Sequence, residues 1–128
     1  MMVQVSAAAL ASENKVLAHP ASIDSIPTSA DKEDHVSMGT IAARKGRDIV
    51  KNVEHILAME LLCATQGLEF LFPLQPGIGI KEAYRVVREK VSPIKGDRRF
   101  STDIKMIQQL IESGELLRRV EKVVGNLK

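Results

Sequence analysis

The longest run of helical apolar spacing predicts one long helix over residues 34–67. No proline interrupts this segment. Its apolar residues recur every three or four positions, as in Ile49, Val53, Ile56 and Leu57. Acidic residues gather near its expected start, where the helix dipole favours negative charge: Asp31, Glu33 and Asp34. Gly67 is the expected end, because glycine commonly terminates helices.

The same spacing predicts shorter helices elsewhere in the chain. Residues 1–12 are rich in alanine and form the end of a helix. Residues 13–33 contain Pro20, Pro27 and many small polar residues, which indicates an irregular loop. Further helices are expected over residues 80–91, 101–113 and 115–125, with Ser101 as an N-cap. Because no strand pattern competes, we predict an all-α fold forming a single helical domain over residues 1–128.

The apolar pattern in the middle of the long helix predicts packing against another chain. Residues 56–64 are apolar on almost every side of a helix, interrupted chiefly by Glu60. A helix of this kind is normally surrounded by other helices, and a buried carboxylate needs a polar partner. A chain of 128 residues has too few other elements to surround it. We therefore expect a homo-oligomer, a larger partner subunit, or both.

Composition excludes several function classes. The net charge is only +2 and aromatic residues make up 3%, so we expect no nucleic-acid binding. No segment approaches the roughly 20 apolar residues that span a bilayer, and the apolar N-terminus lacks the positive charge of a secretory signal. The single cysteine, Cys63, lies in an apolar run, where we expect it to be buried. A lone thiol suits a reducing, cytoplasmic location.

The titratable residues taken alone carry little chemistry. The three histidines, His19, His35 and His55, have no spacing typical of metal ligands, so no metal site is expected. Glu33 has a simple structural interpretation, as a carboxylate in the first turn of the long helix. His35 is better explained by packing or capping than by catalysis with Asp34.

One long segment closely resembles histidine ammonia-lyases. It reads Ser12-Glu-Asn-Lys-Val-Leu-Ala-His-Pro-Ala-Ser-Ile-Asp-Ser-Ile-Pro-Thr-Ser-Ala-Asp-Lys-Glu-Asp-His-Val-Ser-Met-Gly39. The family pattern is S-E-N-K-x-L-A-H-P-A-S-x-D-S-x-P-T-S-A-N-Q-E-D-H-V-S-M. A looser similarity continues through Ala42-Ala-Arg44 and Leu57-Ala-Met-Glu-Leu61. Asp97-Arg-Arg-Phe-Ser-Thr-Asp-Ile104 is similar to the family's D-R-x-F-x-x-D-I.

The resemblance implies a specific enzyme context. Histidine ammonia-lyases convert L-histidine to trans-urocanate and ammonia in histidine catabolism. They are cytosolic, mostly helical homotetramers with a central bundle of long helices, and their active sites combine several subunits. The matched region is the C-terminal part of such an enzyme. Its fold would be the corresponding part of that long-helix bundle.

The family's electrophile is not expected in this chain. That electrophile, a methylidene-imidazolone, forms from an internal Ala-Ser-Gly, and no such tripeptide occurs in the sequence. We therefore expect no catalytic residue in this chain alone. The cofactor would belong to a partner or to the full-length enzyme, and the chain would be inactive without it.

Glu33 is the one functional residue that the resemblance carries over. It matches the Glu of the family's Q-E-D-H, which lies near the substrate imidazole, whereas related phenylalanine lyases have Gln there. Asp31 and Lys32 depart from the family's Asn and Gln, and Lys32 could pair with Glu33. Two hypotheses remain open: a lyase part whose histidine site another part completes, and a non-catalytic helical oligomerisation module or remnant.

Overall fold

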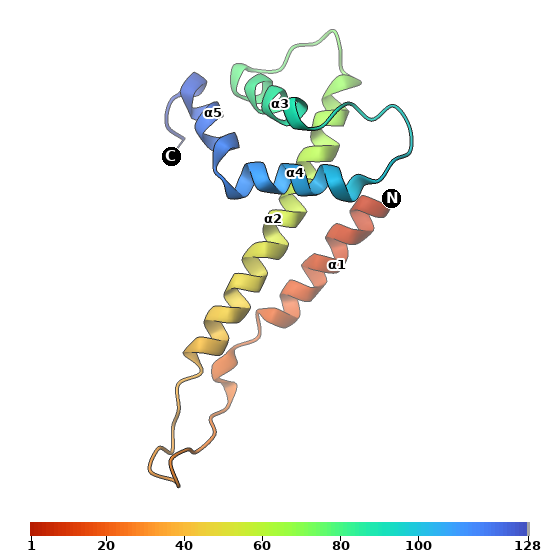
Figure 1. The fold of residues 1–128 in the computed structure, drawn as a ribbon. Helices are drawn as coiled ribbons and strands as arrows, with labels where there is room; N and C mark the ends of the chain where they lie inside the picture. Colours follow the sequence, from red (N-terminus) through yellow and green to blue (C-terminus); the bar gives the residue numbers. More distant parts are fainter. Residues whose placement is uncertain (128) are drawn as a thin grey trace. The chain divides into compact units, whose positions relative to one another are not determined.

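A computed structural model gives the fold and describes residues 1–127. These residues form helices and include no β-strand, which confirms the all-α prediction (Figure 1). The α-helices are α1 (Met2–Leu17), α2 (Gly39–Glu69), α3 (Ile78–Lys90), α4 (Phe100–Glu112) and α5 (Glu115–Val124), with a 3-10 turn at Ala21–Ile23. The chain divides into two compact units, Met1–Val53 and Glu54–Lys128.

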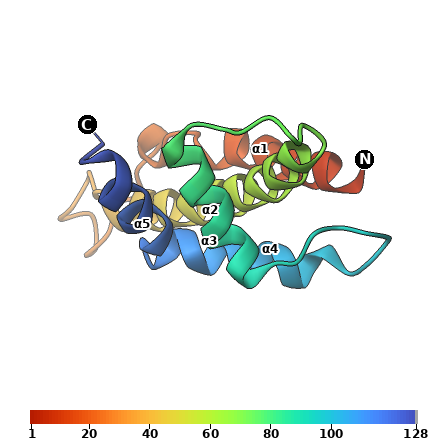
Figure 2. The ribbon, with the colours of Figure 1, turned by 90° about the horizontal axis from the view of Figure 1, so that it is seen from above.

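The first unit is a helical hairpin. The beginning of α2 lies beside α1, and a long loop joins them (Figures 1 and 2). The amide of Asn52 donates hydrogen bonds to Glu13 Oε2 and Asn14 Oδ1, both at 2.9 Å, and Lys45 Nζ donates to the carbonyl of His19. One stripe of α1 is half-buried: Val3, Ala7, Leu10, Asn14 and Leu17. No residue of α1 is fully buried within this chain.

Helix α1 continues five residues beyond its expected end. The prediction placed a helix end over residues 1–12 and a loop over 13–33, but α1 ends at Leu17. Glutamate and lysine at positions 13 and 15 favour helix, and the bonds from Asn52 hold the last turns. The helix stops shortly before Pro20, which restricts the residue that precedes it.

Helix α2 begins five residues later than expected. The prediction started it at residue 34, but the helix starts at Gly39. The backbone N–H of Val36 donates to Ser25 Oγ at 2.7 Å, and Ser25 Oγ also contacts the Val36 carbonyl oxygen at 3.3 Å. Such side-chain bonds compete with helix formation. The segment before Gly39 therefore remains extended.

Gly67 does not end α2, which continues to Glu69. The carboxylate of Glu69 accepts hydrogen bonds from Arg88 Nε at 2.7 Å and from the Tyr84 hydroxyl at 2.9 Å. These bonds to α3 hold the last turn and offset the weak helix propensity of one glycine. The Arg88 side chain is thus mostly buried.

The second unit contains the apolar core. In it, α3, α4 and α5 contact one another pairwise (Figure 2), and His55 Nδ1 on α2 lies 3.0 Å from Gln108 Oε1 on α4. The buried apolar side chains come from α2, α3, α4 and the residue after α3: Ala58, Met59, Leu62, Val86, Val87, Val91, Ile104, Ile107 and Leu110. Removing such side chains from water supplies the main stabilisation of this unit.

The shorter helices lie within two residues of their expected bounds. Ser101 is not the N-cap, because α4 already starts at Phe100. Arg98 Nε instead donates to Asp103 in the first turn at 2.8 Å. Cys63 is exposed within this chain, contrary to the prediction that it is buried. Glu60 is exposed here as well, and its expected burial against a partner stays a prediction. Within residues 56–64, only the face with Ala58, Met59 and Leu62 is buried.

Candidate functional site

The loop between α1 and α2 closes on itself at a short β-bridge. Thr28 and Glu33 pair through their backbones, with N···O distances of 2.9 and 3.3 Å. The turn between them places Ser29, Ala30 and Asp31 in the left-handed region, at φ 55°, 55° and 65°. Non-glycine residues rarely adopt this conformation, and strained backbone of this kind clusters at functional sites. The strained turn beside the bridge makes this loop a candidate functional site.

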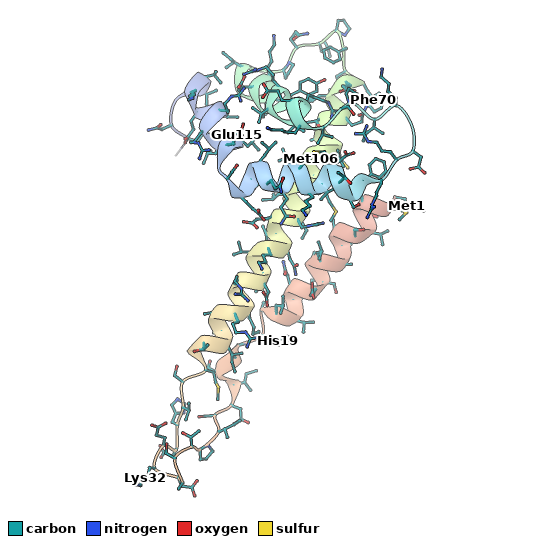
Figure 3. All side chains as sticks on the ribbon, in the orientation of Figure 1. Met1, His19, Lys32, Phe70, Met106 and Glu115 are labelled. Carbon is teal, nitrogen blue, oxygen red and sulfur yellow. The ribbon has the colours of Figure 1, made fainter. Side chains whose placement is uncertain are left out.

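The bridge presents the Glu33 carboxylate to solvent. Glu33 is exposed, and the Thr28 hydroxyl donates a hydrogen bond to its Oε2 at 3.0 Å. Figure 3 shows the neighbouring Lys32 at the outer tip of the loop, with His19 near the end of α1. Within residues 1–127 no ion pair joins Lys32 to Glu33. Lys32 leaves the carboxylate accessible in this structure.

Glu33 does not lie in the first turn of α2, as its simple structural interpretation required. It stands on the extended segment that precedes the helix. That segment continues past the Ser25–Val36 bonds, where His35 lines a small hollow together with Asp24, Ser37 and Met38. The loop thus carries several polar groups besides Glu33, and the backbone bridge fixes the position of the Glu33 main chain.

The bond between Thr28 and Glu33 was missed by reasoning from the sequence. A weak signal exists, because Thr28 precedes a Ser-Ala-Asp turn and Glu33 follows it. Aspartate tolerates left-handed backbone better than most residues. Alanine has no such tolerance, yet Ala30 adopts this conformation, so the turn could not be predicted from the sequence.

The histidines do not come together. His19 Nδ1 lies 3.2 Å from the carbonyl oxygen of Val16, His35 lines the loop hollow, and His55 contacts Gln108. Among residues 1–127 no three His, Cys, Asp or Glu side chains are placed to hold a metal ion. No helix in the described part of the chain is long and apolar enough to cross a membrane.

An apolar hollow after α2 is a weaker candidate for a site. Leu68, Leu71, Phe72 and Leu74 form most of its wall, and Tyr84 and Lys81 stand beside them. The Tyr84 hydroxyl already donates to Glu69. Ligand sites combine apolar walls with convergent polar groups. With the tyrosine engaged elsewhere, this hollow offers little for chemistry.

The densest charge cluster lies between α3 and α5. Arg119 contacts Glu82 at 3.1 Å and Glu89 at 3.2 Å, and Arg85 pairs with the same two carboxylates at 2.8 and 2.7 Å. Hydrogen bonds from Arg85 lower the pKa of Glu82, and those from Arg119 lower the pKa of Glu89. Because each carboxylate is matched by a guanidinium, this cluster joins two helices and is not a reactive site.

Comparison with known proteins identifies the fold around this loop. The sequence model of the aromatic amino acid lyase family matches residues 1–89, which include α1, the loop, α2 and nearly all of α3. The chain belongs to this family. The match includes the whole Thr28–Glu33 bridge.

The most similar relatives include histidine ammonia-lyases. The histidine ammonia-lyase of Symbiobacterium thermophilum is 54% identical over 128 residues, which are 100% of this chain and 25% of that protein. The crystal structure of histidine ammonia-lyase from Trypanosoma cruzi superposes with a TM-score of 0.88 at 47% identity, over 92% of this chain and 23% of the other.

Another solved relative has a different name. Tyrosine aminomutase from Streptomyces globisporus gives a TM-score of 0.84 at 36% identity, over 93% of this chain and 23% of its own. The chain therefore spans about a quarter of the length of the relatives it matches. The same fold segment occurs in lyases and in an aminomutase, so the fold alone does not choose the substrate.

Proposed function

We propose that this chain forms part of a histidine ammonia-lyase and contributes Glu33 to the L-histidine site. The observation that carries the proposal is the exposed Glu33 carboxylate at a closed β-bridge. Similarity to proteins named histidine ammonia-lyase over the whole chain supports it. The reaction would convert L-histidine to trans-urocanate and ammonia.

The proposed role of Glu33 is to bind the substrate ring. An ionised carboxylate only accepts hydrogen bonds, and an imidazole ring N–H donates them. A carboxylate beside the ring also favours its protonated form through opposite charge. A glutamine at this position could accept the bond but would supply no charge. Glu33 would therefore select histidine over substrates with an uncharged ring.

The methylidene-imidazolone does not fit this chain. The printed sequence contains no Ala-Ser-Gly from which it could form. Another part of the enzyme would supply the electrophile. The chain alone would then be inactive, and a larger lyase subunit and further copies of the chain are its proposed partners. The cytoplasmic location expected from the lone cysteine stays a prediction.

The decisive test measures urocanate formation. The purified chain is assayed with L-histidine alone and after mixing with a lyase segment that carries the electrophile but lacks this region. We expect activity only in the mixture. Glu33→Gln should lower kcat/KM roughly 10-fold, because the amide oxygen can still accept a hydrogen bond but without the charge that makes such a bond stronger.

A matched control separates this role from a general charge effect. Glu112→Gln neutralises an exposed carboxylate on α4, and the new amide oxygen still accepts the bond from Gln108 Nε2 (3.0 Å in the parent chain). We expect it to leave activity unchanged. Activity of the chain alone, or full activity of Glu33→Gln in the mixture, would contradict the proposal.

A second candidate function is a non-catalytic oligomerisation module. The observation that favours it is one exposed apolar face of α2, where Val50, Val53 and Leu57 are all at least 41% exposed. Such a module would associate through these side chains and would be indifferent to Glu33→Gln. An oligomer that gives no urocanate in any mixture would favour this alternative.

A further inference from the structure

We propose that Thr28 is a positioning residue that orients the Glu33 carboxylate toward its ligand. This inference rests on the proposed role of Glu33 in binding the histidine ring. The Thr28 hydroxyl donates to Glu33 Oε2 at 3.0 Å. Among residues 1–127 no donor forms a hydrogen bond with the other oxygen, Oε1. One oxygen is thus held and the other is left for an incoming N–H donor.

The backbone bridge fixes the positions of the Cα atoms from which the Thr28 and Glu33 side chains extend. Thr28 and Glu33 stand opposite each other in the bridge, and both backbone bonds between them are formed, at 2.9 and 3.3 Å. Directly opposed residues of an antiparallel pair bring their side chains close together. The left-handed turn of Ser29, Ala30 and Asp31 brings the two sides of the loop back to this register. The side-chain bond therefore has a fixed geometry.

The hydroxyl is not needed for the bridge itself. The backbone bonds join the amide and carbonyl groups, which any residue except proline supplies. Both side chains are exposed, so no buried polar group needs the bond for its satisfaction. The hydroxyl instead sets the orientation of the Glu33 carboxylate. A carboxylate is planar, and holding one oxygen limits where the lone pairs of the other can point.

Orientation matters because glutamate is flexible. A glutamate side chain loses substantial rotamer freedom when a ligand immobilises it, and a binding site that is ordered beforehand avoids part of that cost. A bond from Thr28 would order Glu33 before the substrate arrives. Its loss would weaken substrate binding, leaving the chemical step less affected.

The test compares Thr28→Val with Thr28→Ser in the active mixture of the chain with an electrophile-bearing lyase segment. Valine keeps the branched shape and the β-bridge but has no hydroxyl, whereas serine keeps the hydroxyl. We expect Thr28→Val to raise KM for L-histidine by up to roughly tenfold, the effect of having to order one flexible side chain on binding, with little change in kcat. Thr28→Ser should stay close to the parent chain.

A double-mutant cycle with Glu33→Gln shows whether Thr28 acts through Glu33. We expect Thr28→Val to change KM far less in the Glu33→Gln background than in the parent. A simple loss of hairpin structure would lower the apparent kcat and would add to the effect of Glu33→Gln. If Glu33→Gln lowers activity but Thr28→Val does not raise KM, only the positioning role fails. If Glu33→Gln has no effect, the proposed function fails first.

A second readout does not depend on activity. Three-bond NMR couplings of Glu33 in the chain alone report how strongly its side chain averages over rotamers. We expect more averaging in Thr28→Val than in the parent or Thr28→Ser. Equal averaging in all three forms would refute the orienting bond, whether or not the mixture is active.

Discussion

At the residue scale, the conformation of Asp31 explains why the loop tolerates Asp where the lyase pattern has Asn. The pattern has Asn at this position, and Asp31 adopts φ 65° here. Asn and Asp are the non-glycine residues that enter left-handed backbone most readily. The replacement therefore keeps the local conformation while it adds a negative charge two residues from Glu33.

The turn can be tested by changing the shape of residue 31. Asp31→Val places a β-branched side chain at positive φ, which costs about 1–2 kcal/mol in that conformation. We expect the bridge to open more often, so that exchange of the Thr28 and Glu33 amide hydrogens accelerates roughly 10-fold. Asp31→Asn should leave both exchange rates near those of the parent. Equal rates in Asp31→Val and the parent would contradict the strained turn.

At the element scale, charge joins α5 to α3. Glu82 and Glu89 on α3 each face Arg119 of α5, and Arg85 lies beside both carboxylates. The hydrogen bonds lower both glutamate pKa values below the usual 4.5. A carboxylate with a lowered pKa in the folded state stabilises the fold above its unfolded pKa. That stabilisation is lost as pH falls through the folded value.

We expect the urea midpoint to fall as the pH is lowered from about 5 through the folded pKa values of these two glutamates. Arg119→Gln should weaken this pH dependence, because it removes the charged partner of both carboxylates. Arg118→Gln is the matched control, since Arg118 donates to the carbonyl oxygen of Ser113 (2.8 Å). The same pH dependence in Arg119→Gln and Arg118→Gln would rule out the α3–α5 cluster as its source.

At the scale of the whole molecule, much apolar surface is left uncovered. On α2, Val50, Val53 and Leu57 follow helical spacing and are 55%, 41% and 42% exposed. Exposed apolar patches of this kind mark interaction surfaces. The relatives are about four times as long as this chain, so a longer lyase subunit or a further copy of the chain is the expected cover.

Association is therefore expected of the purified chain. Sedimentation over a range of concentrations should detect an oligomer. Val50→Lys combined with Leu57→Lys should raise its dissociation constant at least tenfold, because burying each apolar side chain contributes about 1–3 kcal/mol. Leu127→Lys, a change at another exposed leucine, should have a smaller effect. A monomer at all concentrations would contradict the expectation.

The sequence by itself determined the fold class and the family. Helical spacing without any competing strand pattern predicted an all-α chain, and the run from Ser12 to Gly39 resembled one family in an unusual motif. The three short helices were placed within two residues. Their ends are encoded locally, by Pro93 after α3 and by Gly114 between α4 and α5.

Only the tertiary structure decided where α2 begins and ends and where Glu33 stands. Acidic residues near position 33 fit a helix start, but bonds across the loop, from Ser25 to Val36 and from Thr28 to Glu33, hold this segment extended. Gly67 fitted a helix end, but bonds from α3 to Glu69 extend the helix. In both cases partners 5 to 19 residues away along the chain outweigh a local preference of about 1 kcal/mol or less, because that preference is weak.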